Sequence, residues 1–203
     1  FKKGEPFNRK KLQSTQKNLE ASGYFKHVTI TPHQKQSSTE GVPTDVSLEM
    51  AKRQQYLAGL GFGTDTGARA TLGMNMKRLN SRGHRFTSLA QLSTSDNINA
   101  QASYLIPGHN PVTDLYSINA GYSEIEQSTG NSHAKKLALG KTITHHDFKS
   151  SFFINFLNEN YNLTTLPYTT AKLIYPNLNI AYKNSDDPLN PTEGITSSLN
   201  ISG

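Results

Sequence analysis

The residues best suited to metal binding or proton transfer are three neighbours, His145, His146 and Asp147. Imidazole nitrogens and carboxylates serve both as metal ligands and as general bases. Successive residues of a strand point to opposite faces, however, so two adjacent histidines cannot easily hold one metal ion in extended backbone. The spacing favours a polar turn over a metal site.

Two pairs of carboxylates could in principle bind calcium or act as an acid and a base. Asp186 and Asp187 stand next to Pro188 and Pro191, which favours a turn. Glu124 and Glu126 fall at the end of an expected strand, where we expect them to be solvated.

No motif for nucleophilic or phosphate chemistry accompanies these residues. The sequence has no Gly-x-Ser-x-Gly elbow, no glycine-rich loop between a strand and a helix, and no cysteine. We therefore expect no catalysis, no cofactor and no metal site. The net charge of +6 raises the possibility of nucleic-acid binding. No aromatic-basic pattern supports it, and a solvated helix face that includes Arg9, Lys10, Lys11 and Lys17 is the simpler interpretation.

The elements that would position these side chains change character near residue 55. Residues 1–52 predict a helix from about Asn8, a glycine stop at Gly23, and two short strands separated by a polar loop over 33–44. The expected core comprises Leu12, Leu19, Phe25, Val28, Ile30, Val46 and Leu48. This order of elements indicates the C-terminal part of a small α+β domain.

Residues 56–203 instead alternate between apolar and polar side chains, as strands with one apolar face do. One such stretch is Tyr116, Ile118, Ala120 and Tyr122. We expect strands over 56–63, 68–79, 84–94, 98–106, 113–124, 134–144, 148–158 and 170–182, and a ninth from Ile195, with Pro176 at a bulge. Only 34% of the residues are hydrophobic and the mean hydropathy is −0.59. Both values suit a transmembrane antiparallel β-barrel with a polar interior.

Several stretches resemble a known family in order and spacing. Residues 1–30 resemble the last part of a POTRA domain. Residues 59–67, 80–86 and 173–176 resemble the first half of the barrel of TamA-type members of the BamA/TamA superfamily, and 186–194 is similar to a Pro-x-x-Gly turn of that superfamily. The resemblance implies a mainly β fold: the C-terminal part of a POTRA domain over 1–52, then the N-terminal half of an outer-membrane barrel over 56–203. We accordingly expect the chain to be a fragment.

The family implies a function without bond chemistry. Its members insert β-barrel proteins and autotransporters into the bacterial outer membrane, with the POTRA domains in the periplasm. The partners implied are outer-membrane lipid, nascent outer-membrane protein clients and, through POTRA, an inner-membrane-anchored TamB-like subunit, with no nucleic acid. A lateral gate would form at the first barrel strand, here Tyr56, Ala58, Gly59, Leu60, Gly61, Phe62 and Gly63.

Gly59, Gly61 and Gly63 would face the barrel interior and permit two interpretations. They leave space for a plug or a close backbone approach, or they weaken the strand because glycine costs entropy on ordering. Two other functions also remain open from the residues alone. A passive porin-like or transporter barrel would share the polar interior, and a soluble β-rich binding module would share the strands.

Overall fold

The computed structural model describes residues 6–38, 41–64, 67–94, 97–127, 129–163, 166–185 and 192–203. The chain divides into two compact units, Phe1–Arg53 and Gln54–Gly203. Among the described residues no helix is both long and apolar enough to cross a membrane. The motif expected over 186–194 lies largely outside the described residues.

The described part of the first unit contains one α-helix, α1 (Arg9–Ala21), with the ends that the sequence predicts. The side chain of Asn8 caps the helix, because its Oδ1 accepts a hydrogen bond from the backbone N–H of Lys11 at 3.2 Å. Gly23 follows the helix with a φ of 71°, a conformation that favours glycine. Both predicted helix signals are confirmed.

The helix packs on a two-stranded antiparallel sheet formed by β1 (Phe25–Pro32) and β2 (Thr44–Met50). A short 3₁₀ turn, η1 (Gln34–Gln36), stands in the loop between them. Val28 of β1 pairs with Leu48 of β2, and Ile30 pairs with Val46. The apolar residues of both strands therefore share one face.

The predicted core of this unit is only partly correct. Leu12 and Val28 are buried, but Val46 is 50% exposed and Leu48 is 44% exposed. Among the described elements α1 contacts β1 and not β2, so the apolar face of β2 lies beyond the helix. Leu19 is half-buried rather than fully buried.

We therefore predict that Leu12→Ala destabilises this unit by about 2–5 kcal/mol, because the substitution leaves a cavity in a packed site. Val46→Ala serves as the matched control and should cost less than about 0.5 kcal/mol, since half of that side chain already meets solvent. Hydrogen exchange of the α1 and β1 amides in the full protein measures both effects. Equal losses of protection in the two variants would contradict this core.

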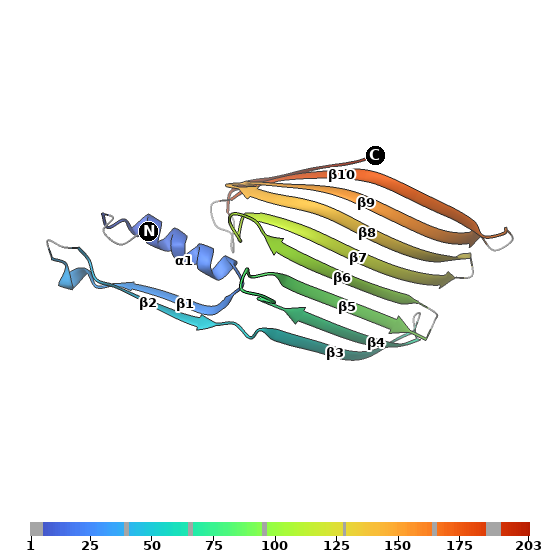
Figure 1. The fold of residues 1–203 in the computed structure, drawn as a ribbon, viewed down its shortest axis with the longest axis horizontal. Coiled ribbons are helices and arrows are strands. Elements are labelled where there is room, and N and C mark those ends of the chain that lie inside the picture. Colours follow the sequence, from blue (N-terminus) through green and yellow to red (C-terminus); the bar gives the residue numbers. More distant parts are fainter. Residues whose placement is uncertain are drawn as a thin grey trace. The chain divides into compact units, whose positions relative to one another are not determined.

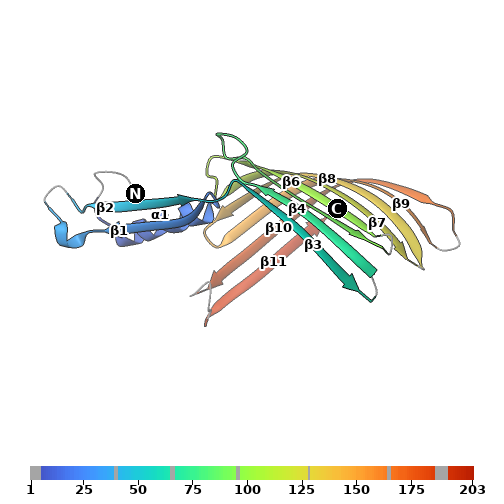
Figure 2. The same cartoon turned by 90° about the horizontal axis from the view of Figure 1, so that it is seen from below.

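The described residues of the second unit form a single antiparallel sheet of nine strands in chain order. Figures 1 and 2 show this succession, with β3 and β11 at the two edges. The strands are β3 (Gln54–Gly63), β4 (Gly67–Met76), β5 (Arg85–Ser93), β6 (Ile98–Pro107), β7 (Asp114–Gln127), β8 (Gly130–His145), β9 (Phe148–Leu163), β10 (Thr169–Ser185) and β11 (Gly194–Ser202). The predicted mainly β fold with about nine barrel-like strands is confirmed.

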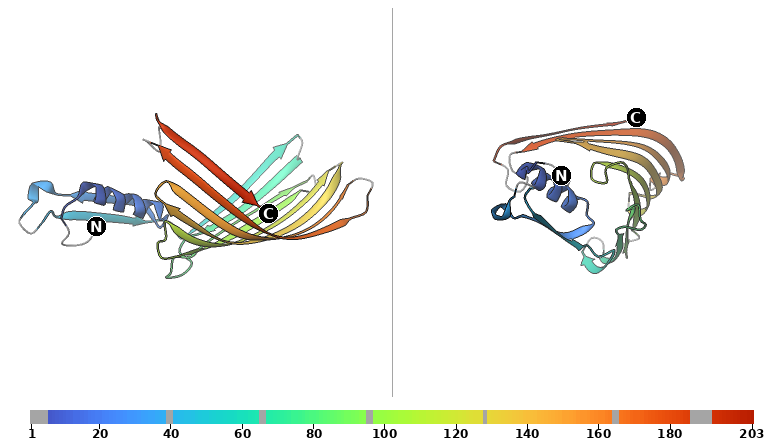
Figure 3. Two further views of the ribbon diagram at one scale, coloured as in Figure 1. Left: turned by 90° about the horizontal axis from the view of Figure 1, so that it is seen from above. Right: turned by 60° about the vertical axis from the view of Figure 1, so that its left-hand side comes forward.

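The register sorts the side chains onto two faces. Ile118, Leu139 and Ile154 are directly paired across β7, β8 and β9, and they form an apolar row. The next row along the strands pairs Asn119 with Ala138 and Asn155. The sheet curves strongly, as Figure 3 shows. The polar face is the more enclosed one, because Asn155 is 5% exposed whereas Ile154 is 41% exposed. The polar face is therefore the concave face.

Two strands are longer than predicted. The alternation predicts that β9 ends at residue 158 and that β8 starts at residue 134, but their pairing continues to Gly130 opposite Leu163. In this extension Asn160 and Asn162, like Asn158 at the predicted end, stand where the convex face is otherwise apolar. The ladder continues while the alternation disappears, so the sequence pattern could not reveal it. The other strand ends differ from prediction by only a few residues; β3, for example, begins at Gln54.

The convex apolar residues form a band of membrane dimensions. On β9 the band runs from Phe148 to Phe156, and on β10 from Ile174 to Tyr182. Eight steps of about 3.3 Å give about 26 Å along each strand. A strand tilt of about 40° reduces this to about 20 Å, which is close to the apolar band of about 25 Å in outer-membrane barrels.

Pro176 does not form the predicted bulge. It pairs with Ile154 in an unbroken β9–β10 register. Its carbonyl accepts a hydrogen bond from the N–H of Gly203 at 3.2 Å. In an antiparallel strand the nitrogen and the carbonyl of one residue point to the same neighbour. The missing donor of Pro176 therefore faces the β11 side, one position beyond the last pair of strand residues, Asn177 and Ser202.

We predict that Ile118→Arg destabilises the full-length protein in a lipid bilayer by about 2–4 kcal/mol, because it places a charge in the apolar band. Gln101→Arg on the concave face should be nearly neutral. Asn119 is a poorer control, since its amide is hydrogen-bonded to Ser103. Denaturant titration of the bilayer-folded variants measures the difference, and equal costs would refute the assignment of faces.

Candidate functional site

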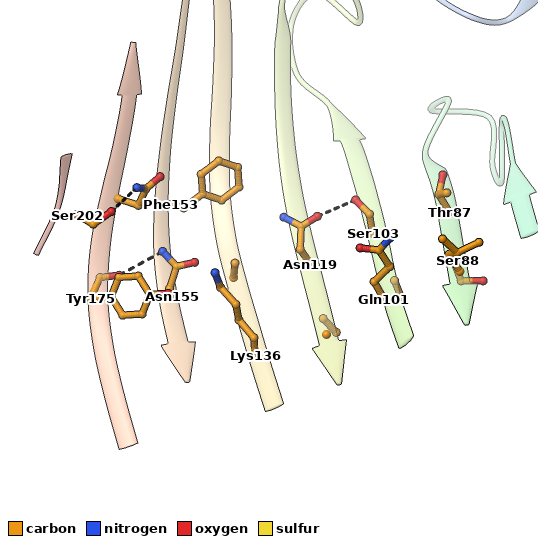
Figure 4. Close-up of a pocket in the computed structure, with 16 residues that line it drawn as sticks. Thr87, Ser88, Gln101, Ser103, Asn119, Lys136, Phe153, Asn155, Tyr175 and Ser202 are labelled. Atoms are coloured by element: carbon orange, nitrogen blue, oxygen red, sulfur yellow. Dashed lines mark hydrogen bonds between the residues drawn. The ribbon is translucent and has the colours of Figure 1, made fainter. Parts of the chain in front are cut away.

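The concave face holds a hollow of about 650 Å³ between β5 and β11. Figure 4 shows polar side chains from successive strands directed into it. The hydroxyl of Ser103 donates a hydrogen bond to Asn119 Oδ1 at 2.7 Å. The amide of Asn119 donates in turn to the Ser117 hydroxyl at 3.4 Å. This part of the hollow is a chain of neutral hydrogen-bonding groups.

The other side of the hollow is built in the same way. Asn177 donates to Asn200 Oδ1 at 2.9 Å and to the Ser202 hydroxyl at 2.8 Å. Lys136 adds a cation, and its Nζ lies 5.7 Å from the centre of the Tyr175 ring. The amides and hydroxyls named here are satisfied by one another and show no nucleophile with an adjacent base. The lining suits water or a polar peptide rather than catalysis.

The candidate metal cluster is a turn, as predicted. His145 is the last residue of β8, and His146 lies in the turn with a φ of 51°. Asp147 accepts a hydrogen bond from the Asn184 amide at 2.7 Å. Across the described ranges no group of three or more His, Asp or Glu side chains is placed to hold a metal ion.

The carboxylate expectations have mixed outcomes. The Asp186–Asp187 pair lies outside the described residues. Glu124 is not simply solvated, because its side chain is only 23% exposed. Its carboxylate accepts a hydrogen bond from the Tyr122 hydroxyl at 2.8 Å and lies 3.3 Å from Nδ1 of His133. Cross-strand pairing with His133, which a local pattern cannot show, produces this contact.

The predicted gate strand is an edge strand. β3 pairs with β4 along its whole length, and its other side has no partner strand among the described residues. Alternate residues of such an edge direct their N–H and C=O groups outward. Its convex side chains are also exposed: Leu60 is 92% exposed and Phe62 is 77% exposed. β3 therefore offers both unpaired backbone and apolar surface.

Two glycines of β3, Gly59 and Gly61, are not required by nearby atoms in the described structure. A Cβ added at Gly61 would meet nothing within 4 Å, and one at Gly59 would lie 3.8 Å from Thr71 Cβ, an ordinary contact. Neither residue has a positive φ. Gly73 on β4 differs, since an added Cβ would lie 3.2 Å from both Leu57 and Leu89. Open space at these positions is compatible with both interpretations, room for a plug and a weakened strand.

At the opposite edge, β11 runs to the last residues of the given sequence. β10 pairs with β11 only over Asn177–Ser185, although β10 begins at Thr169. Residues 169–175 therefore pair with β9 alone within the described sheet.

Comparison with known proteins supports both units. Residues 1–50 match the family model described as POTRA, a surface antigen variable number repeat. The chain is also similar to the crystal structure of BamA from Haemophilus ducreyi lacking POTRA domains 1–3, with a TM-score of 0.58 and 13% sequence identity. The match covers 94% of this chain and 42% of that chain, so this chain spans less than half the length of that structure. These findings support the BamA/TamA-type superfamily at the level of fold, and they do not single out its TamA-type members.

We predict that Gly61→Ala protects the β3 amides from hydrogen exchange by about 0.4–1 kcal/mol, because alanine reduces the freedom of the unfolded chain and meets no clash. Gly73→Ala should have the opposite effect, since its Cβ would press on Leu57 and displace β3. Exchange measured on the full protein in detergent tests both. Equal protection in the two variants would show that β3 is not limited by its glycines.

Proposed function

We propose that this chain acts in an outer-membrane assembly factor of the TamA type. Such a factor inserts β-barrel proteins and autotransporters, and translocates them, through a lateral gate. The observation that carries the proposal is β3, an edge strand with an unpaired backbone and bare apolar side chains that begins directly after the POTRA-like unit. The POTRA match and the BamA-like fold support the same function.

The mechanism is the addition of a client strand to this edge. The outward N–H and C=O groups of β3 would pair with the backbone of the client. Tyr56, Leu60 and Phe62 would continue the lipid-facing apolar surface alongside the apolar residues of the client. Glycines on the concave side would leave room for its polar residues. A client with the same two-residue alternation thus fits this edge, and no bond is made or broken.

Separation of β3 from a paired strand would be easy because β3 pairs weakly. Each glycine in a strand interior costs roughly 0.5–1 kcal/mol relative to alanine. The three glycines at 59, 61 and 63 together lower the free energy needed to separate this strand from a partner. A gate that must open and close repeatedly requires such a weakly held strand.

The environment proposed is the bacterial outer membrane. Lipid would cover the convex band that contains Ile118 and Ile154, and the first unit would lie in the periplasm. That unit would contact an inner-membrane-anchored TamB-like subunit. Nascent outer-membrane proteins would be the clients, and nucleic acid would have no role.

A passive barrel is the second candidate, because the concave lining of Gln101, Asn119 and Lys136 would also suit a water-filled channel. The POTRA match speaks for assembly instead. Conductance of the full-length protein in a planar bilayer, without any assembly of an added client, would favour the channel. A soluble binding module is the weakest candidate, since it would have to cover the whole convex band.

The gate is tested with single cysteines at Ala58, Leu60 and Phe62 of the full-length protein, combined with a stalled client that carries one cysteine in its terminal strand. We expect disulfide crosslinks at these positions, because the client strand would lie beside β3. Cysteines at Ile118 and Ala120 on the inner strand β7 are the controls and should give few crosslinks. Equal crosslinking at β3 and β7, or no crosslinks at β3 while client assembly proceeds, would contradict the gate and favour the passive barrel.

A further inference from the structure

A second hollow, of about 430 Å³, lies on the convex face over β8, β9 and β10. Leu137, Phe156 and Ile174 line it, and they occupy one row of paired residues. The next row, which contains Lys135, Asn158 and Lys172, also lines it. The hollow therefore has an apolar row next to a row with two cations and an amide.

The two lysines flank the amide at a distance that suits one small anion. Lys135 and Lys172 each pair directly with Asn158, from opposite sides. Neighbouring strands are about 4.8 Å apart, so the two lysine backbones are separated by roughly 10 Å. Flexible side chains of four methylene groups can bring both ammonium groups over the Asn158 amide. A phosphate, with three acceptor oxygens, could accept hydrogen bonds from all three groups.

These cations have no counter-charge in the described structure. Lys135 and Lys172 make no ion pair or side-chain hydrogen bond there. The nearest convex carboxylate along the β7–β8 ladder, Glu124, is already held by Tyr122 and His133. Lys141 shows the contrast, because this cation within the apolar band lies 3.4 Å from Asp114 and donates to the Tyr116 hydroxyl at 3.1 Å. Lys141, which lies within the apolar band, is paired inside the protein. Lys135 and Lys172 lie at the rim of the band and can bind a ligand instead.

The row of lysines marks one end of the apolar band. It lies toward the end of the sheet where β7 joins β8 and β9 joins β10, and away from the end where β3 begins. If the first unit is periplasmic, as the proposed function requires, this end reaches the outer leaflet. A ligand here would have its headgroup at the lysine row and its acyl chains along Leu137, Phe156 and Ile174.

We propose that this hollow binds a phosphate-bearing lipid of the outer leaflet. Lys135, Lys172 and the Asn158 amide hold the phosphate, and the apolar row holds an acyl chain. A zwitterionic lipid brings its own cation and would bind more weakly. The inference rests on the membrane placement in the proposed function, but it does not depend on assembly activity.

The test titrates the full-length protein in neutral detergent with lipid A, a disaccharide lipid with two phosphate monoesters, and counts bound lipids by native mass spectrometry. Each lysine near a membrane surface contributes about 1 kcal/mol to binding an anionic lipid, which is about fivefold in affinity. We expect Lys135→Gln and Lys172→Gln each to weaken binding about fivefold. Lipid A from which both phosphates have been removed should bind the unsubstituted protein as weakly as it binds either variant.

Lys149→Gln is the matched control, because it removes the same charge from the concave face of β9, away from the residues that line the hollow. It should change the affinity less than twofold. An equal loss in Lys135→Gln and Lys149→Gln, or no loss in either rim variant, would overturn the proposal. Client assembly in phosphatidylcholine vesicles by the Lys135→Gln variant should be unchanged. Normal lipid binding in a protein that assembles no client would count against the proposed function and leave this inference standing.

Discussion

Backbone pairing between consecutive strands is the constraint on which the large sheet depends. Each unpaired N–H or C=O costs several kcal/mol in hydrocarbon, so a strand in lipid must find partners on both sides. The seven inner strands, β4 to β10, have such partners in an unbroken antiparallel order. The same register places Ile118, Leu139 and Ile154 on one face and Asn119 and Asn155 on the other. A slip of one residue would exchange the faces, so the register fixes the convex apolar band and the polar hollow together.

The fold could be predicted where a local pattern determines the structure. Two-residue alternation located nine strands, and Asn8 and Gly23 marked the ends of α1, because these signals act over a few residues. Prediction failed where contacts between residues far apart in the sequence determine the structure. Val46 and Leu48 are apolar but exposed, since no sequence pattern says how far α1 extends across the sheet. The outer part of β9 was missed because its asparagines remove the alternation while the ladder to β8 persists.

The sequence predicts where a gate would lie, but not what surrounds that strand. Family resemblance and three glycines pointed to residues 56–63, and the structure adds that this strand lies at an edge with open space at Gly61. An edge is defined by the absence of a neighbour along the sheet, which no residue of the strand encodes. The Lys135–Asn158–Lys172 row could not be predicted from the sequence either. Its members are separated by many residues and come together only through the β8–β9 and β9–β10 pairing.

The strictly sequential order of the strands also has a kinetic consequence. Each ladder of the large sheet joins strands that are neighbours along the chain, and even a distant pair such as Phe148 and Tyr182 belongs to consecutive strands. Such a topology has low contact order, so each closure costs only the entropy of a short segment. The sheet can grow one strand at a time, because each new strand pairs with the strand that precedes it in the chain. Growth in this order limits how much unpaired backbone the sheet carries at any moment.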